Sequence, residues 1–136
     1  MTRLELEEYI FDTYGVRPDY PWDGTPSSEV FRHGDNKKWF ALIMDVPKSS
    51  LGIPGGGTLC AVNLKCGPIV GGSLCGQNGF FPAYHMNKEY WITAALDGSV
   101  PESDIKMLLD ISFCETAKRK AVKKPSRNER RPDRFL

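Results

Sequence analysis

One short segment, residues 81–93, concentrates aromatic and unlike polar side chains that could contact a ligand. Its candidate residues are Tyr84, His85, Asn87, Lys88 and Trp91. An asparagine amide can pair with a base edge, a lysine ammonium suits a phosphate, and aromatic rings offer stacking surfaces. None of the five is an obvious nucleophile, so the segment indicates recognition rather than catalysis. The simpler interpretation is a turn between two strands, with half-buried aromatic rings and with His85 and Asn87 bonded to the backbone.

A second set of candidates lies on the stretch 58–66. Cys60, Val62 and Leu64 alternate there with more polar positions, which is the period of a strand with one face in the core. This alternation predicts that Asn63 and Lys65 lie on the exposed face. Both residues are therefore candidate nucleic-acid contacts.

The C-terminal end of the chain is strongly basic. Residues 118–136 hold nine Lys and Arg against two Asp and Glu, a net charge of +7, whereas residues 1–117 carry −6. Such asymmetry is typical of an arm for nucleic acid or for an acidic protein partner, or of a disordered tail. We therefore predict one domain over residues 1–117 and a disordered tail over 118–136. The basic residues that we assign to nucleic-acid binding are Lys118, Arg119, Lys120, Lys123 and Lys124.

Length and composition limit the other possibilities. A chain of 136 residues, 40% hydrophobic and 26% charged, can bury the core of a single domain. The first residues lack an uninterrupted apolar run, and no later run approaches the length needed to cross a bilayer, so we expect a cytoplasmic protein that does not contact membranes. Four scattered cysteines, with neither a C-x-x-C pair nor a histidine cluster, predict reduced thiols and no metal or cofactor.

The elements that position these residues can be read in order. A capping box at Thr2 and Glu5 predicts a helix that ends at Gly15, and an irregular connection follows, in which Trp22 anchors the loop to the core. The remaining predicted elements are strands over 29–33 and 38–46, a Gly/Pro-rich loop over 47–58, the strand over 58–66, a short helix from Pro68 to about Cys75, strands over 80–85 and 90–96, and a helix from about Pro101 whose apolar stripe faces the core. This order indicates an α+β fold with a mainly antiparallel sheet and with the N- and C-terminal helices packed on it.

Several short motifs carry a family resemblance. They are Tyr20-Pro21-Trp22, Lys38-Trp39-Phe40-Ala41, Val62-Asn63-Leu64-Lys65-Cys66, Pro82-Ala83-Tyr84-His85-Met86-Asn87-Lys88, Tyr90-Trp91-Ile92 and Asp97-Gly98-Ser99-Val100-Pro101. In their order and spacing, residues 1 to about 120 resemble the MmcQ/YjbR family of small bacterial proteins. The Gly52 to Gly57 loop, Cys66-Gly67, Gly71-Gly72 and the basic tail depart from the family pattern.

The resemblance implies a CyaY-like fold and a relation to a double-wing DNA-binding motif. It supplies no catalytic residues. The frataxin-like architecture that it implies would also suit metal binding on the first helix, but Glu5, Glu8 and Asp12 form only a sparse acidic face.

Three functions remain open on the sequence. The first is a non-catalytic DNA-binding module that uses the sheet face and the basic tail. The second is a protein-interaction or stress-associated module with an acidic partner. The third is a small-molecule-binding protein that uses His85 with Lys88 or Tyr84, and a pocket that converges on His85 would favour it.

Overall fold

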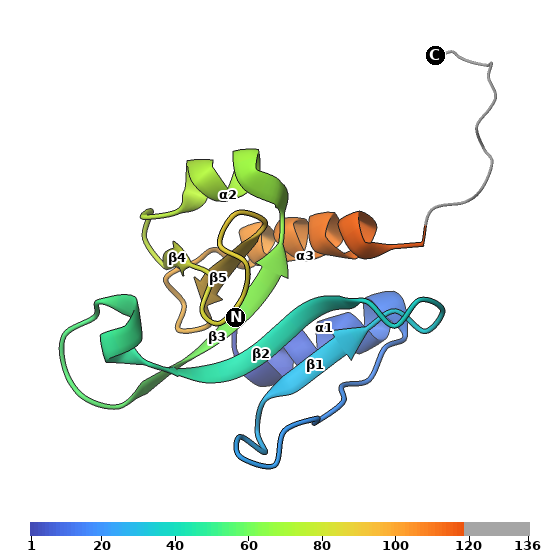
Figure 1. Ribbon diagram of the computed structural model, residues 1–136, viewed down its shortest axis with the longest axis horizontal. Helices are drawn as coiled ribbons and strands as arrows, with labels where there is room; N and C mark the ends of the chain where they lie inside the picture. The colour runs from blue at the N-terminus through green and yellow to red at the C-terminus, as the bar shows by residue number, and fades with distance from the viewer. Residues whose placement is uncertain (119–136) are drawn as a thin grey trace.

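Within residues 1–118, the part of the chain that the computed structural model describes, three α-helices alternate with five strands (Figure 1). Their α+β composition confirms the predicted fold class. The elements are α1 (Arg3–Tyr14), β1 (Glu29–Arg32), β2 (Trp39–Pro47), the 3-10 helix η1 (Lys48–Leu51), β3 (Thr58–Lys65), α2 (Gly67–Leu74), β4 (Phe80–Pro82), β5 (Trp91–Ala95) and α3 (Glu102–Thr116).

Helix α1 begins and ends where its sequence predicts. The Thr2 hydroxyl accepts from the Glu5 backbone N–H at 3.2 Å, and the Glu5 carboxylate accepts from the Thr2 N–H at 2.8 Å. These two bonds satisfy backbone donors that a helix start otherwise leaves free. Gly15 ends the helix at φ 71°, a conformation that costs glycine little.

The five strands form one antiparallel sheet in the order β1-β2-β3-β5-β4. Outside β1, Asp19 forms an isolated bridge with Val30. At the other edge β4 has only three residues, so the strand predicted over 80–85 is too long. Pro82 has no N–H to donate, and beyond it the Tyr84 backbone bonds to side chains rather than to a strand.

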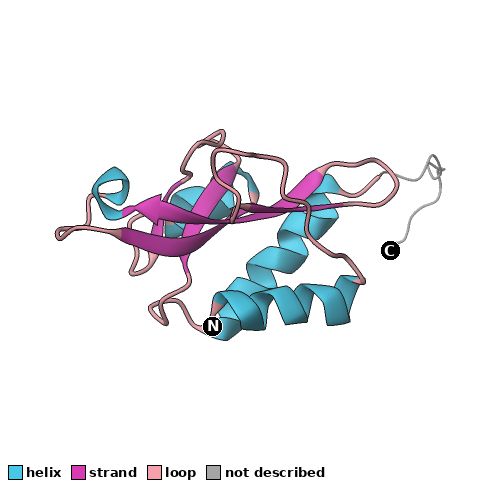
Figure 2. Cartoon of the chain, turned by 90° about the horizontal axis from the view of Figure 1, so that it is seen from below, coloured by secondary structure: helices cyan, strands magenta, loops and turns pink. Residues whose placement is uncertain are grey.

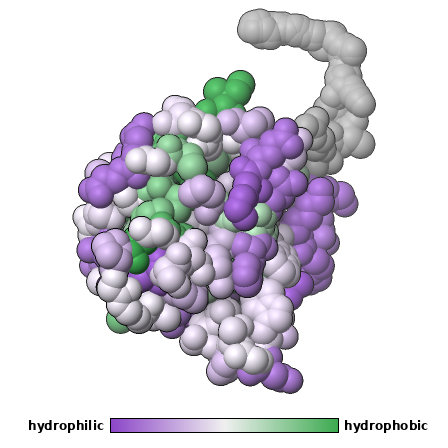
Figure 3. Space-filling view, turned by 60° about the vertical axis from the view of Figure 1, so that its left-hand side comes forward, coloured by the Kyte–Doolittle hydropathy of each residue, from purple (hydrophilic) through white to green (hydrophobic). Residues whose placement is uncertain are grey.

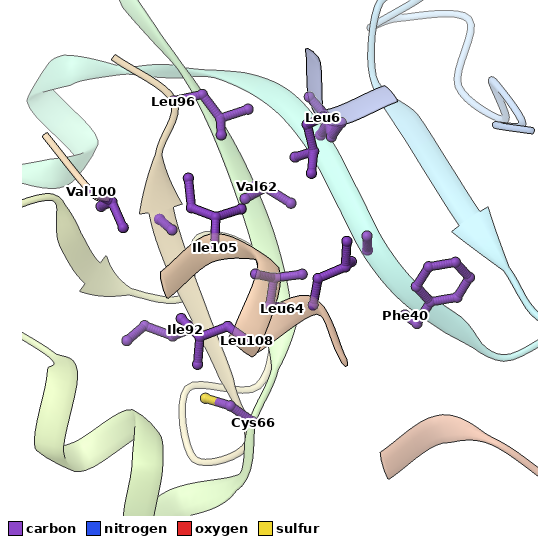
Figure 4. Close-up of a cluster of buried hydrophobic side chains, with 14 of the residues drawn as sticks. Leu6, Phe40, Val62, Leu64, Cys66, Ile92, Leu96, Val100, Ile105 and Leu108 are labelled. Atoms are coloured by element: carbon purple, nitrogen blue, oxygen red, sulfur yellow. The ribbon is translucent and has the colours of Figure 1, made fainter. Parts of the chain in front are cut away.

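Two helices cover one face of the sheet. Figure 2 shows them as a layer on one side of the strands, with loops on the other side. Leu6 and Ile10 of α1 pack with the apolar stripe of α3 and with inward residues of β3 and β5 in a single core, which Figure 4 shows in part. The Ser112 hydroxyl joins α3 to the sheet, because it donates to the Phe40 carbonyl at 2.5 Å and accepts from the Lys65 N–H at 2.9 Å.

A β-bulge changes the direction of side chains at the start of β2. Phe31 lies opposite Ala41 and Arg32 lies opposite Trp39, so Phe40 is the extra residue. A bulge breaks the strict alternation of a strand. As a result Phe40 and Ala41 both join the helix-covered core, while Trp39 packs on the opposite face.

The helices of the described part are short for a bilayer. No helix between residues 1 and 118 combines the length and the apolar character that a membrane span requires.

Candidate functional site

The face of the sheet that lies opposite α1 and α3, here called the second face, has its own apolar cluster. Its buried members are Val30, Leu42, Met44, Val46 and Ala61. Side chains of loops, of strand ends and of η1 pack on this cluster in place of an α-helix, among them Trp39, Tyr84 and Met86. The second face is therefore covered only in part, which leaves room for a ligand.

Asn63 lies on the second face but is fully buried, so the prediction that it is exposed is wrong. Its Nδ2 donates to the Tyr84 carbonyl at 2.8 Å, and its Oδ1 accepts from the Thr93 hydroxyl at 2.5 Å. The Thr93 Oγ1 in turn accepts from the Tyr84 N–H at 2.9 Å. The segment after β4 crosses above Asn63, and that covering loop was not visible in the alternation of β3. Asn63 and Thr93 together hold Tyr84 against the sheet.

His85 follows Tyr84 on this loop and is exposed to solvent. Its backbone adopts φ 58°, in the left-handed region that non-glycine residues seldom occupy. The His85 ring stacks on the Tyr84 ring, with centroids 3.9 Å apart and an interplanar angle of 14°. The bonded Tyr84 backbone fixes this stacked pair in place, and such strained, well-supported residues are concentrated at binding sites.

Trp22, on the connection between α1 and β1, reaches the second face as well. The Trp22 and Trp39 rings meet edge to face, with centroids 5.6 Å apart. This connection is held from the other side of β1, where the Glu29 carboxylate accepts from Arg3 Nε at 3.0 Å and from the Tyr20 hydroxyl at 2.8 Å. The Arg3 guanidinium also donates to the Ser27 carbonyl.

Glu7 belongs to the same polar group, which surrounds the buried Glu29 carboxylate. The neighbouring Glu29 carboxylate, through a shared hydrogen bond, together with burial, raises the pKa of Glu7 to about 7, although the Arg3 charge opposes the rise. Glu29 itself is almost fully buried. The anchorage of the connection therefore includes a carboxyl group that changes its charge near neutral pH.

The connection between α1 and β1, strand β2 and the loop after β4 together enclose a pocket of about 400 Å³ on the second face. Its floor includes Leu42 and Met44 of β2, and its polar groups include the hydroxyls of Thr25 and Ser28. The full lining is Trp22, Thr25, Ser28, Trp39, Leu42, Met44, Asp45, Tyr84, His85 and Met86. The volume falls in the range of small-ligand sites, and so does the combination of aromatic walls with a few polar groups.

The lining has a distinct electrostatic character, because it contains acidic Asp45 but neither lysine nor arginine. A phosphate or carboxylate would find no cation there.

The pocket also lacks the geometry expected of a catalytic site. A nucleophile and its base normally lie within hydrogen-bond reach of each other. Within residues 1–118, no hydrogen bond joins His85 to the hydroxyl of Ser28 or Thr25. The arrangement suits the binding of a ring between aromatic walls more than it suits acyl or phosphoryl transfer.

Three of the predicted contact residues lie elsewhere. Lys65 and Trp91 are register partners at the end of β3 and the start of β5, and the Lys65 ammonium lies 6.0 Å from the Tyr90 ring centroid. Lys88 and Trp91 line a smaller pocket of about 260 Å³ against α2. The tip of α2 is apolar and exposed, with 86% of Ile69 accessible, and Figure 3 shows green side chains at the top of the molecule, where α2 lies in Figure 1.

Asn87 forms a turn and bonds to the backbone, as the simpler interpretation of the segment predicts. Its Oδ1 accepts from the Glu89 N–H at 2.8 Å, and its carbonyl accepts from the Trp91 N–H at 2.9 Å. Lys118 is exposed after the end of α3. Arg119, Lys120, Lys123 and Lys124 lie outside the described residues, so their predicted role stays a prediction.

The sequence reasoning missed most of the pocket. Trp22 was predicted only as a loop anchor, and Trp39, Leu42 and Met44 were predicted only as strand residues. One signal was present, because β2 is apolar on both faces while residues 1–118 contain only two long helices, which cover one face. A sheet face with apolar residues and no helix to cover it is a natural place for a ligand.

Comparison with known proteins places this geometry in a family. The YjbR family model matches residues 11–115. The uncharacterized protein YyaQ of Bacillus subtilis (strain 168) is 40% identical over 113 residues, which cover 83% of this chain and 96% of YyaQ.

Solved structures agree with the sequence match. A Pseudomonas syringae protein of known crystal structure is 43% identical in sequence and superposes with a TM-score of 0.84. The match covers 86% of this chain and 100% of the Pseudomonas chain. Deinococcus radiodurans protein DR2400, with a DUF419 domain, is 24% identical with a TM-score of 0.66, over 90% of this chain and 83% of its own. The second likeness concerns the fold alone.

Proposed function

The chain belongs to the YjbR family, and from that premise we propose that it is a non-catalytic binding protein that takes a small planar ligand in the pocket on the second face. The observation that carries the proposal is the convergence of four aromatic rings on one pocket from three separate segments. Trp22, Trp39, Tyr84 and His85 supply these rings. Rigid aromatic walls bind flat ligands by stacking and by burial of apolar surface, at little cost in side-chain entropy.

The charge of the lining narrows the ligand class. Because the lining contains the acidic residue Asp45 but no lysine or arginine, a neutral or cationic ring fits better than an anionic one. The hydroxyls of Thr25 and Ser28 can orient the polar edge of such a ring. We therefore expect neutral or cationic heteroaromatic compounds to bind and their carboxylated analogues to bind more weakly.

The experiment that tests this proposal is a fragment screen on the full chain by ligand-detected NMR. The fragment set consists of matched neutral, cationic and anionic heteroaromatic compounds. We compare the chain with two variants, Trp22→Ala, which removes a wall of the pocket, and Trp91→Ala, which removes an aromatic ring outside it. Binding that falls at least about tenfold in Trp22→Ala and stays within about twofold in Trp91→Ala supports the proposal, since loss of one stacked ring costs roughly 1–3 kcal/mol.

Two results would contradict it. One is a fragment set that binds nowhere on the protein. The other is binding that is equally weakened by both tryptophan substitutions, because the site would then lie outside the pocket.

A second candidate function, DNA binding, rests on the basic residues. Residues 118–136 carry +7, and Lys65 and Lys88 add two cations near α2. Such a charge supports contacts to phosphates that do not depend on base sequence. The pocket adds no support, because its lining lacks cations.

The DNA hypothesis predicts a steep salt dependence. For the full chain, the logarithm of the binding constant should fall with the logarithm of salt concentration by about 0.9 for each phosphate neutralised. Lys123→Gln with Lys124→Gln should flatten that slope, and Lys65→Ala with Lys88→Ala should do so only if the sheet end also contacts DNA. A chain that does not bind DNA at low salt would exclude this function.

A further inference from the structure

A second hollow, here called the α1 groove, lies away from the ligand pocket. It measures about 630 Å³ and runs between α1 and the connection that follows α1. Leu4, Phe11 and Tyr20 line it, and their exposed fractions of 63%, 42% and 58% are high for large apolar or aromatic side chains. The α1 groove shares no lining residue with the pocket on the second face.

The α1 groove is predominantly acidic. Glu7, Glu8, Asp12 and Glu29 line it against one cation, Arg17. Arg3 pairs with Glu7 at 3.5 Å and with Glu29 at 3.0 Å. In the described part of the chain, Glu8 and Asp12 take part in no ion pair.

An aromatic ring of the α1 groove already accepts a guanidinium. The Arg17 Cζ lies 4.2 Å from the centroid of the Phe11 ring. Cations bind the faces of aromatic rings, and exposed carboxylates add long-range attraction. The chemistry of the α1 groove therefore fits a basic segment that also carries apolar side chains.

We propose that the α1 groove is a docking site for the basic C-terminal segment of the same chain, residues 119–136. This segment has eight Lys and Arg against two acidic residues, and it ends in Arg134-Phe135-Leu136. Its basic residues complement the free carboxylates of Glu8 and Asp12. Its two terminal apolar side chains match the exposed rings of the groove.

The length of the segment and its point of departure permit this docking. Helix α3 lies against the end of α1, because the Tyr14 hydroxyl donates to the Asp110 carboxylate and the Tyr14 and Phe113 rings stack at 4.2 Å. Eighteen residues span up to about 60 Å when extended. That reach exceeds the roughly 35 Å diameter of a domain of this size.

Tethering lowers the affinity that docking needs. A segment joined to the domain by a short linker is present at an effective concentration on the order of a millimolar. A few solvent-exposed ion pairs and one apolar contact can then hold the segment in the groove for much of the time. The docking does not depend on the function proposed for the pocket, and it would compete with phosphates for the same basic residues.

Carbodiimide cross-linking of the full chain tests the docking. This reagent joins a lysine amine directly to a carboxylate, so it reports contacts between Lys120, Lys123 or Lys124 and the groove. We expect cross-links to Glu8 and Asp12 in at least about fivefold excess over those to Asp23 and Glu89, two exposed carboxylates on other loops. Raising salt from about 0.05 M to about 0.5 M should reduce the excess several-fold.

A variant that keeps every charge gives the matched control. Phe135→Ser with Leu136→Ser leaves all lysines and carboxylates in place, and it should lower the cross-links to Glu8 and Asp12 about threefold or more if the apolar end occupies the groove. An equal mixture of isotope-labelled and unlabelled chains separates contacts within one chain from contacts between two chains. Cross-links of mixed mass would assign the groove to a second copy and overturn the proposal. An even distribution over all exposed carboxylates would also overturn it.

Discussion

The two faces of the sheet are built from similar apolar strands but are covered in different ways. On the helix-covered face, α1 and α3 complete a continuous core in which Leu6, Leu64 and Leu108 are fully buried. On the second face, loops held by single hydrogen-bonded groups surround a pocket. The comparison shows that the larger enclosed core lies on the helix-covered face, whereas the second face keeps a pocket that the proposed ligand would need.

The largest expected effect is on the helix-covered face. Leu108→Ala should lower the free energy of unfolding by about 2–5 kcal/mol, because it leaves a cavity in a fully enclosed core. Met44→Ala on the second face should cost less, about 2 kcal/mol or below, since Met44 borders a pocket and is not enclosed by core side chains on all sides. Urea denaturation of both variants measures the difference, and equal losses would break the comparison.

A smaller effect is expected where Asn63 and Thr93 hold the loop. Asn63→Leu should destabilise the protein by about 1–3 kcal/mol, because the partly buried Tyr84 carbonyl and the buried Thr93 hydroxyl each lose a partner. Thr93→Ser keeps the hydroxyl and serves as the control. Hydrogen exchange should accelerate at the Tyr84 amide in Asn63→Leu and much less in Thr93→Ser. Unchanged exchange at Tyr84 would mean that the loop is held by other contacts.

The backbone of His85 predicts a still smaller effect on stability. His85→Gly should change the free energy of unfolding by less than about 0.5 kcal/mol, because relief of the left-handed conformation offsets the lost stacking and the greater freedom of the unfolded chain. His85→Ala keeps the strain and loses the stacking, so it should be destabilised by about 1 kcal/mol. Thermal unfolding of the pair tests this order, and a glycine variant less stable than the alanine variant would contradict it.

The smallest expected effect depends on pH and links the two faces. The pKa of Glu7 is raised to about 7, so protonated Glu7 is favoured in the folded state. Its contribution to stability is complete below its ordinary pKa and is lost as pH rises through 7. Because the Glu7 side chain is only partly buried and solvent screens its interactions, we expect a change of no more than about 0.4 kcal/mol between pH 5 and pH 8. Glu7→Gln should remove this pH dependence, as urea denaturation at several pH values would show.

The sequence predicted the fold well because its signals are local. The capping box, Gly15 and the apolar stripe of α3 each depend on residues within a few turns, and they fixed the helices. The hairpin of β1 and β2 followed from short-range alternation. The CyaY-like character that the family resemblance implies stays a prediction.

The site was predicted less well because it depends on long-range packing. The burial of Asn63 results from a loop 21 residues further along the chain. The position of Trp39 results from a bulge opposite β1, which no pattern within β2 reveals. The segment around Tyr84 and His85 was correctly chosen as the centre of interest, but its partners Trp22 and Trp39 come from other segments.

The two outer strands determine how another protein can approach this domain. The Val30 N–H and carbonyl of β1 already bond to Asp19, at 2.9 Å and 2.8 Å, and β4 is short and ends at Pro82. Neither strand offers a long row of free backbone groups, so β-augmentation by an incoming peptide, or edge-to-edge aggregation, is disfavoured. A partner of this domain therefore has to recognise side chains. The domain can present the pocket on the second face and the α1 groove to solvent without exposing a strand edge that would pair with another chain.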